Sequence, residues 1–124
     1  MVKPETLDVK RAITCHQFSE KIKSELIIAS RLLWTVEELK GEELEGAKKL
    51  FSSFLDALIA EINLAYTVVK MQDFEKANTK VMEIKESISL GQYQEAAKLI
   101  SQAISFVTTC GHRAAETLIE KGLF

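Results

Sequence analysis

The chain contains almost no residues that stop a helix. Its 124 residues include one proline and five glycines, whereas all-β folds need turn signals about every dozen residues. Apolar residues recur at spacings of three and four over long stretches, which is typical of the buried face of an α-helix. The scarcity of turn residues and this spacing together predict an all-α fold.

The first two predicted helices are long. We expect the first to start near Pro4 to Thr6, because proline suits a first helical turn, and to end at Gly41 as a C-terminal cap. An acidic connector, 41–46, then leads into a second helix that ends around residues 71–72, with Leu50 and Leu58 on its inward stripe. The inward positions of the first helix are Ala12, Cys15, Phe18, Ile22, Leu26, Ala29, Leu33 and Val36.

The other two predicted helices differ in length. Asp73 is a suitable N-cap for a short third helix, from Phe74 to about Leu90. The fourth runs from about Tyr93 to Gly122, and the glycine inside it, Gly111, indicates a kink or a close helix crossing. Because short connectors join antiparallel neighbours, the sequence predicts a single domain over 1–124, folded as a four-helix up-and-down bundle with a short third helix.

Charge and cysteine usage narrow the classes of partner. The formal net charge is −2, and both signs are interspersed along the chain, which argues against a nucleic-acid partner. Two cysteines far apart in sequence form neither a zinc-binding pattern nor a dense disulfide framework, so we expect a cytoplasmic location. No cofactor is predicted.

Membrane association is not predicted either. The charged N-terminus, 1–10, lacks the apolar run of a signal peptide. The most apolar stretch, 26–36, contains Arg31 and is shorter than the roughly 20 residues of a membrane-spanning helix. Residues 55–69 are interrupted by Asp56 and Glu61.

Part of the first helix is apolar around its whole circumference. A bundle helix needs one apolar stripe and a polar back, but residues 26–36 place large apolar side chains on both. Excess apolar surface of this kind marks an interface. We therefore predict a homodimer, with Ile27, Ile28 and Trp34 as interface residues; less regular packing within one subunit is the alternative.

Cys15 and Cys110 fall at the same level of an antiparallel first and fourth helix, and both occupy inward positions. A disulfide between them would need Cα atoms within about 7 Å, whereas packed helix axes lie 8–10 Å apart. The sequence therefore favours two buried thiols that act as small apolar side chains.

The two histidines are the candidate metal ligands. His16 and His112 each precede a glutamate by four residues, Glu20 and Glu116, on the same helix face. Bundle metal sites combine such pairs with further inward glutamates, and none is evident here. His112 lies about 200° around the helix from Cys110 and is predicted to face solvent.

Arg11 and His16 are separated by four residues, a spacing that resembles the motif of HEPN ribonucleases, helical dimers that pair two such motifs across their interface. The resemblance covers six residues. Ala12 stands where the family has a polar residue, and the motif lies in the first helix rather than late in the domain. It implies a small dimeric ribonuclease with Arg11 and His16 as catalytic residues.

Motifs for other chemistry are missing from the sequence. It contains no glycine-rich phosphate loop, nucleophile elbow or HExxH helix. The leading prediction is a non-enzymatic, homodimeric protein–protein interaction or scaffold module. The HEPN-like ribonuclease and a metal- or ligand-binding bundle are the alternatives.

Overall fold

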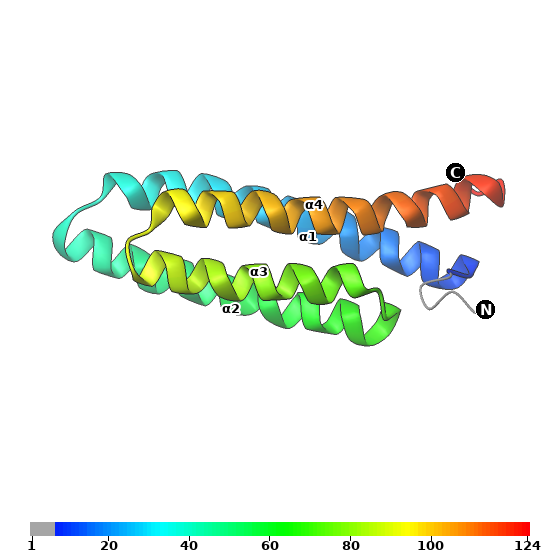
Figure 1. Cartoon of the computed structure of the whole chain (residues 1–124), viewed down its shortest axis with the longest axis horizontal. Helices are drawn as coiled ribbons and strands as arrows, with labels where there is room; N and C mark the ends of the chain where they lie inside the picture. The colour runs from blue at the N-terminus through cyan, green and yellow to red at the C-terminus, as the bar shows by residue number, and fades with distance from the viewer. Residues whose placement is uncertain (1–6) are drawn as a thin grey trace.

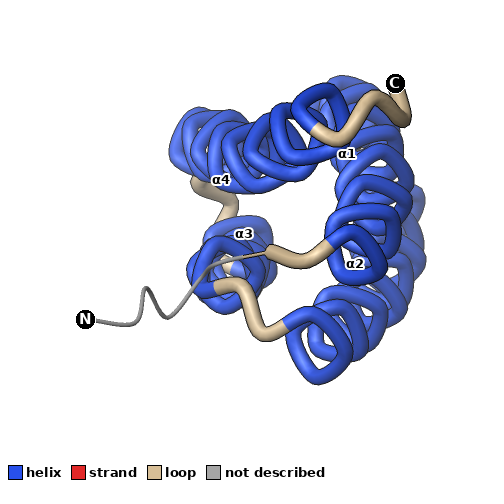
Figure 2. Tube along the Cα trace, turned by 90° about the vertical axis from the view of Figure 1, so that its right-hand side faces the viewer, coloured by secondary structure: helices blue, strands red, loops and turns tan. Residues whose placement is uncertain are grey.

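Four helices make up the part of the chain that the structure, a computed structural model, describes, residues 7–124. They are α1 (Val9–Glu38), α2 (Gly41–Val69), α3 (Gln72–Ser89) and α4 (Tyr93–Glu120). Each helix packs against the next, and α4 closes the ring on α1 (Figures 1 and 2). The prediction of an up-and-down four-helix bundle with a short third helix is confirmed.

The short α3 makes the bundle uneven at both ends. It has 18 residues, against 28 to 30 in the other three helices. Figure 1 shows the α1–α2 turn reaching past the α3–α4 turn at one end. At the other end, α1 and α4 extend beyond the α2–α3 turn. The bundle is therefore four helices thick only along its middle.

One apolar core runs along the axis, and the predicted spacing locates most of it. In α1 all the predicted inward residues are buried except Phe18, which is half-buried, while Ser19 takes an unpredicted buried position. The prediction for Leu50 is wrong, since its side chain is 76% exposed. The buried stripe of α2 passes through the next residue, Phe51, and one residue turns a helix by about 100°.

The first helix starts later than predicted. Leu7 and Asp8 are not helical, and Asp8 caps α1 by accepting a hydrogen bond from Arg11 N at 2.8 Å, so the predicted earlier start is wrong. Residues 4–6 lie outside the described part.

The α1–α2 connection is shorter than predicted. α1 ends at Glu38, before Gly41. Gly41 is instead the first residue of α2. Its φ is +62°, a backbone conformation that glycine adopts without strain.

The predicted N-cap of α3 is also wrong. Met71 occupies that position, and Asp73 lies buried in the first turn. Its carboxylate is 3.6 Å from the Arg113 guanidinium of α4. Asp73 therefore joins two helices rather than capping one.

The ends of α3 and α4 follow the prediction. Gly91 and Gly122 take positive φ, and Leu123 N donates to Leu118 O at 2.8 Å. This six-to-one hydrogen bond, with the matching bond from Gly122 to Ile119 at 3.0 Å, is the Schellman motif.

By length and composition alone, α2 could cross a membrane, and 28% of its most apolar window is buried in the bundle. The core helix of a soluble protein meets the same criteria.

α1 and α4 approach closely at Ser19 and Gly111. A Cβ atom added to Gly111 would lie 2.9 Å from Ser19 Cβ and 3.3 Å from its Oγ, well inside normal contact. Gly111 therefore marks a close helix crossing, one of the two roles that its position predicted. A side chain at this position would force the neighbouring atoms to shift.

Gly111→Ala tests this contact. Although alanine favours a helix by about 1 kcal/mol over glycine, we expect a net loss of about 1–2 kcal/mol in the free energy of unfolding because the core is overpacked. Urea titration followed by circular dichroism measures it.

Two further variants control for this loss. Gly46→Ala, in α2, meets nothing within 4 Å and should gain about 0.5–1 kcal/mol. Adding Ser19→Gly to Gly111→Ala removes the opposing Cβ, so the two changes together should cost less than their sum. Additive costs would contradict a direct Ser19–Gly111 contact.

Candidate functional site

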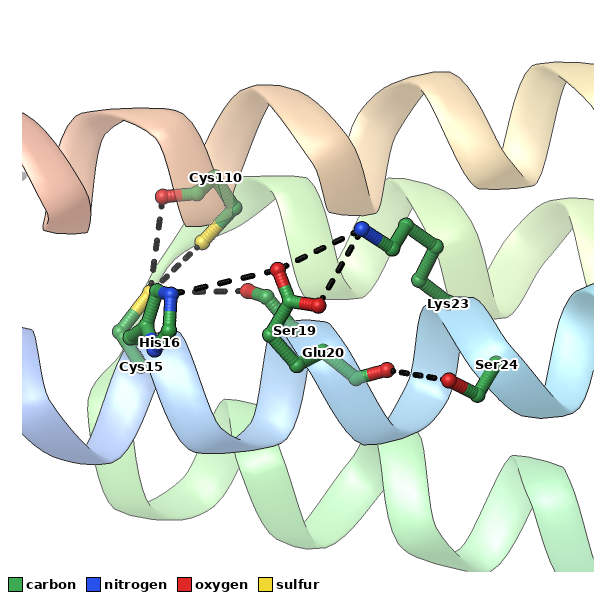
Figure 3. A network of polar contacts seen from close by, with 7 residues as sticks. All are labelled: Cys15, His16, Ser19, Glu20, Lys23, Ser24 and Cys110. Carbon is green, nitrogen blue, oxygen red and sulfur yellow. Dashed lines mark hydrogen bonds and ion pairs between the residues drawn. The ribbon is translucent and has the colours of Figure 1, made fainter.

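The two cysteines meet next to the Ser19–Gly111 crossing: Cys110 precedes Gly111, and Cys15 lies one helical turn before Ser19. Both thiols are free and fully buried, one from α1 and one from α4. Cys15 Sγ lies 3.0 Å from Cys110 Sγ and 3.7 Å from the Cys110 carbonyl oxygen (Figure 3). Ser19 Oγ is 3.9 Å from the same sulfur. The sequence predicted two buried thiols, but not a contact between them.

The two sulfur atoms differ in their affinity for a proton. A hydrogen bond from the Cys110 thiol lowers the pKa of Cys15, and the Ser19 hydroxyl and the nearby Arg11 act in the same direction against burial. The same contact with Cys15, with burial, raises the pKa of Cys110.

A shallow groove of about 180 Å³ lies along the α1–α4 seam, outside the cysteines. Ser19 lines it and also contacts the Cys15 sulfur, so one side chain separates the groove from the thiol pair. The full lining comprises His16, Ser19, Glu20, Lys23, Val107, Thr108, Gly111, His112 and Ala115.

The histidines stand at this groove in separate pairs. His16 Nε2 lies 3.9 Å from Glu20 Oε1, and its ring meets Phe124 edge to face at 4.9 Å. His112 is exposed to solvent, as its helical position predicts, with Nε2 3.0 Å from Glu116 Oε1. Within residues 7–124 no three His, Cys, Asp or Glu side chains form a group that could hold a metal ion.

Arg11 and His16 do not form a joint site. Five residues along a helix correspond to a rotation of about 140°. Arg11 Nε donates to the Val69 carbonyl oxygen at 3.1 Å, and its Nη2 donates to the same oxygen. That carbonyl ends α2, where no intrahelical donor remains and a positive charge complements the helix dipole. Arg11 therefore joins α1 to α2, whereas His16 lies towards α4.

A second unpredicted polar contact joins α1 and α2. Burial, followed by the neighbouring carboxyl of Glu61, raises the pKa of Glu25 from 4.5 to about 7. Lys21 Nζ lies 3.0 Å from Glu61 Oε1, and its positive charge opposes part of this rise in the pKa of Glu25. The sequence showed Glu61 only as an interruption of an apolar stretch.

The three predicted interface residues are all exposed. Trp34 is 75% exposed, and Ile27 and Ile28 are 45% and 47% exposed. Leu32, one turn after Ile28, is also exposed. Less regular packing within the subunit, the alternative that the sequence left open, does not bury them.

Comparison with known proteins gives no match: no protein-family model, no curated protein and no solved structure is significantly similar to the chain.

Glu25→Gln tests whether a proton on Glu25 stabilises its contact with Glu61. The raised pKa of Glu25 means that its contribution to stability is complete below about pH 4.5 and is lost as pH rises through about 7. Glutamine stays neutral and can still donate to Glu61. We expect the variant to have a higher melting temperature than the wild type at pH 8, and the difference to shrink towards pH 5.

Scanning calorimetry across this range measures the effect. Glu38→Gln, at an exposed position of the same helix, is the matched control and should show no such trend. A difference in melting temperature between Glu25→Gln and wild type that stays constant from pH 5 to pH 8 would argue against a raised pKa of Glu25.

Proposed function

We propose that the protein is a non-enzymatic interaction module that forms a homodimer through the outer face of α1, defined as Ile27, Ile28, Leu32 and Trp34. The observation that carries this proposal is the exposure of a tryptophan beside three large aliphatic side chains within two helical turns. The proposal keeps the cytoplasmic location that the sequence predicts.

These four side chains lie along two lines on the exposed half of α1. Residues seven apart, Ile27 and Trp34, form one line, and residues four apart, Ile28 and Leu32, form the other, roughly 130° further around the helix. Arg31 stands between the two lines. Tryptophan and arginine are the residue types that most often dominate binding energy at protein interfaces.

Symmetry favours a second copy of this chain as the occupant, because most soluble oligomers are built from identical copies and twofold dimers are the commonest. A twofold axis through α1 would pair this face with itself.

The ribonuclease alternative has no comparable support. Its arginine, Arg11, donates two hydrogen bonds to the carbonyl oxygen at the end of α2, and His16 lies about 140° around the helix from it. The metal-binding alternative lacks a third ligand among the described residues.

Trp34→Glu tests the dimer. We expect the wild type at micromolar concentration to have twice the monomer mass of 13.9 kDa in size-exclusion chromatography with light scattering. A charge at the centre of the interface removes a residue of hot-spot type, typically worth 2 kcal/mol or more, so the dissociation constant should rise by at least about 30-fold.

Met82→Glu is the matched control. Met82 is also a large exposed apolar residue, but it lies on α3, across the bundle from α1. It should leave the dimer intact. A wild-type monomer at this concentration, or a dimer that Trp34→Glu and Met82→Glu affect equally, would refute the proposal.

A further inference from the structure

We propose that Cys15 and Cys110 form a redox modification site, at which a hydroperoxide oxidises the two thiols to a disulfide that joins α1 to α4. The site is separate from the proposed dimer face, and either proposal can fail without the other.

The distance between the sulfur atoms answers the objection that helix spacing raises against a disulfide. They are 3.0 Å apart, so an approach of about 1 Å reaches the bond length of about 2.05 Å. Gly111 follows Cys110 directly, and Ser19 is one turn beyond Cys15. These two small residues leave no room for a Cβ on residue 111 without a shift, which indicates a close approach of α1 and α4 beside the cysteines.

The surroundings assign different roles to the two sulfurs. Cys15 Sγ lies 3.0 Å from the Cys110 thiol and 3.9 Å from the Ser19 hydroxyl, two groups that can donate to a sulfur anion. In the proposed reaction Cys15 is therefore the thiolate that attacks an oxygen of the hydroperoxide, and its contact with the Cys110 carbonyl oxygen, to which the Cys15 thiol donates at 3.7 Å, is given up. The O–O bond breaks, hydroxide leaves and takes up a proton to become water, and Cys15 becomes a sulfenic acid. Cys110, 3.0 Å away, is positioned as the resolving thiol.

The second step closes the disulfide. Cys110 gives up its proton and its sulfur attacks Cys15 Sγ; the S–O bond breaks and the oxygen leaves as water. In total, two thiols and one hydrogen peroxide give one disulfide and two waters, with two electrons passing from sulfur to peroxide.

Access selects a small oxidant. Both thiols are fully buried, and Ser19 and Gly111 are among the residues that line the groove on the α1–α4 seam. A neutral molecule of the size of hydrogen peroxide needs only a small opening between these two residues, whereas a bulky disulfide reagent must separate the helices. We therefore expect peroxide to oxidise the folded protein faster than oxidised glutathione or an aromatic disulfide does.

The test uses the full, reduced chain treated with hydrogen peroxide, then denatured and alkylated. We expect both cysteines to resist alkylation and peptide mapping to recover a Cys15–Cys110 cross-link, which dithiothreitol reverses. The cross-link spans 95 residues, so the oxidised chain should migrate faster on a non-reducing denaturing gel. Its melting temperature should rise by roughly 10 °C.

Two sets of variants make the result specific. Cys15→Ala and Cys110→Ala should each abolish the cross-link and the rise in melting temperature. Gly111→Ala, which pushes the helices apart, should slow cross-linking several-fold, and Gly46→Ala should not change its rate. Peptide mapping of the wild type stands even if a cysteine variant folds poorly.

Three results would overturn the proposal. They are two thiols that both remain alkylatable after prolonged peroxide treatment, disulfides only between chains, and separate oxidation of each cysteine to sulfinic acid without a cross-link.

Discussion

The contact between Ser19 and Gly111 determines how closely α1 and α4 can pack, and much of the bundle depends on it. A Cβ on residue 111 would lie 2.9 Å from Ser19 Cβ, so any residue other than glycine would have to push the two helices apart. The short distance brings the thiols of Cys15 and Cys110 to 3.0 Å. It also leaves a shallow groove on the outside of the seam. One small residue in α4 thus sets both the packing and the chemistry at this level.

Polar contacts, rather than the apolar core alone, fix how the other helices are aligned. Arg11 of α1 donates to the last carbonyl of α2, and Asp73 of α3 lies against Arg113 of α4. Apolar stripes tolerate sliding, because one aliphatic side chain replaces another at little cost. Asp73 is buried, and a buried polar group that loses its partner destabilises the fold, so these contacts favour one alignment of each helix pair.

The outer surface of α1 differs from that of a helix in a tidy monomer. Its inward stripe is complete, from Ala12 to Val36, yet Trp34 remains exposed on the opposite side. Burial of the core therefore explains only half of the apolar residues between 26 and 36. The other half is what supports a protein surface as the partner of this helix.

The sequence by itself determined the four helices, the short third one and most of the core, because each follows from residue spacing within one helix. It also located the cysteines at one level and marked Gly111 as the site of a kink or a close crossing. Only the tertiary structure decided between these two roles, and only it decided that the thiols touch, that Arg11 joins α2 instead of acting with His16, that Asp73 pairs with Arg113, and that the carboxyl of Glu61 raises the pKa of Glu25. These outcomes depend on distances between helices, and the periodicity of a single helix carries no information about which residue of another helix stands opposite.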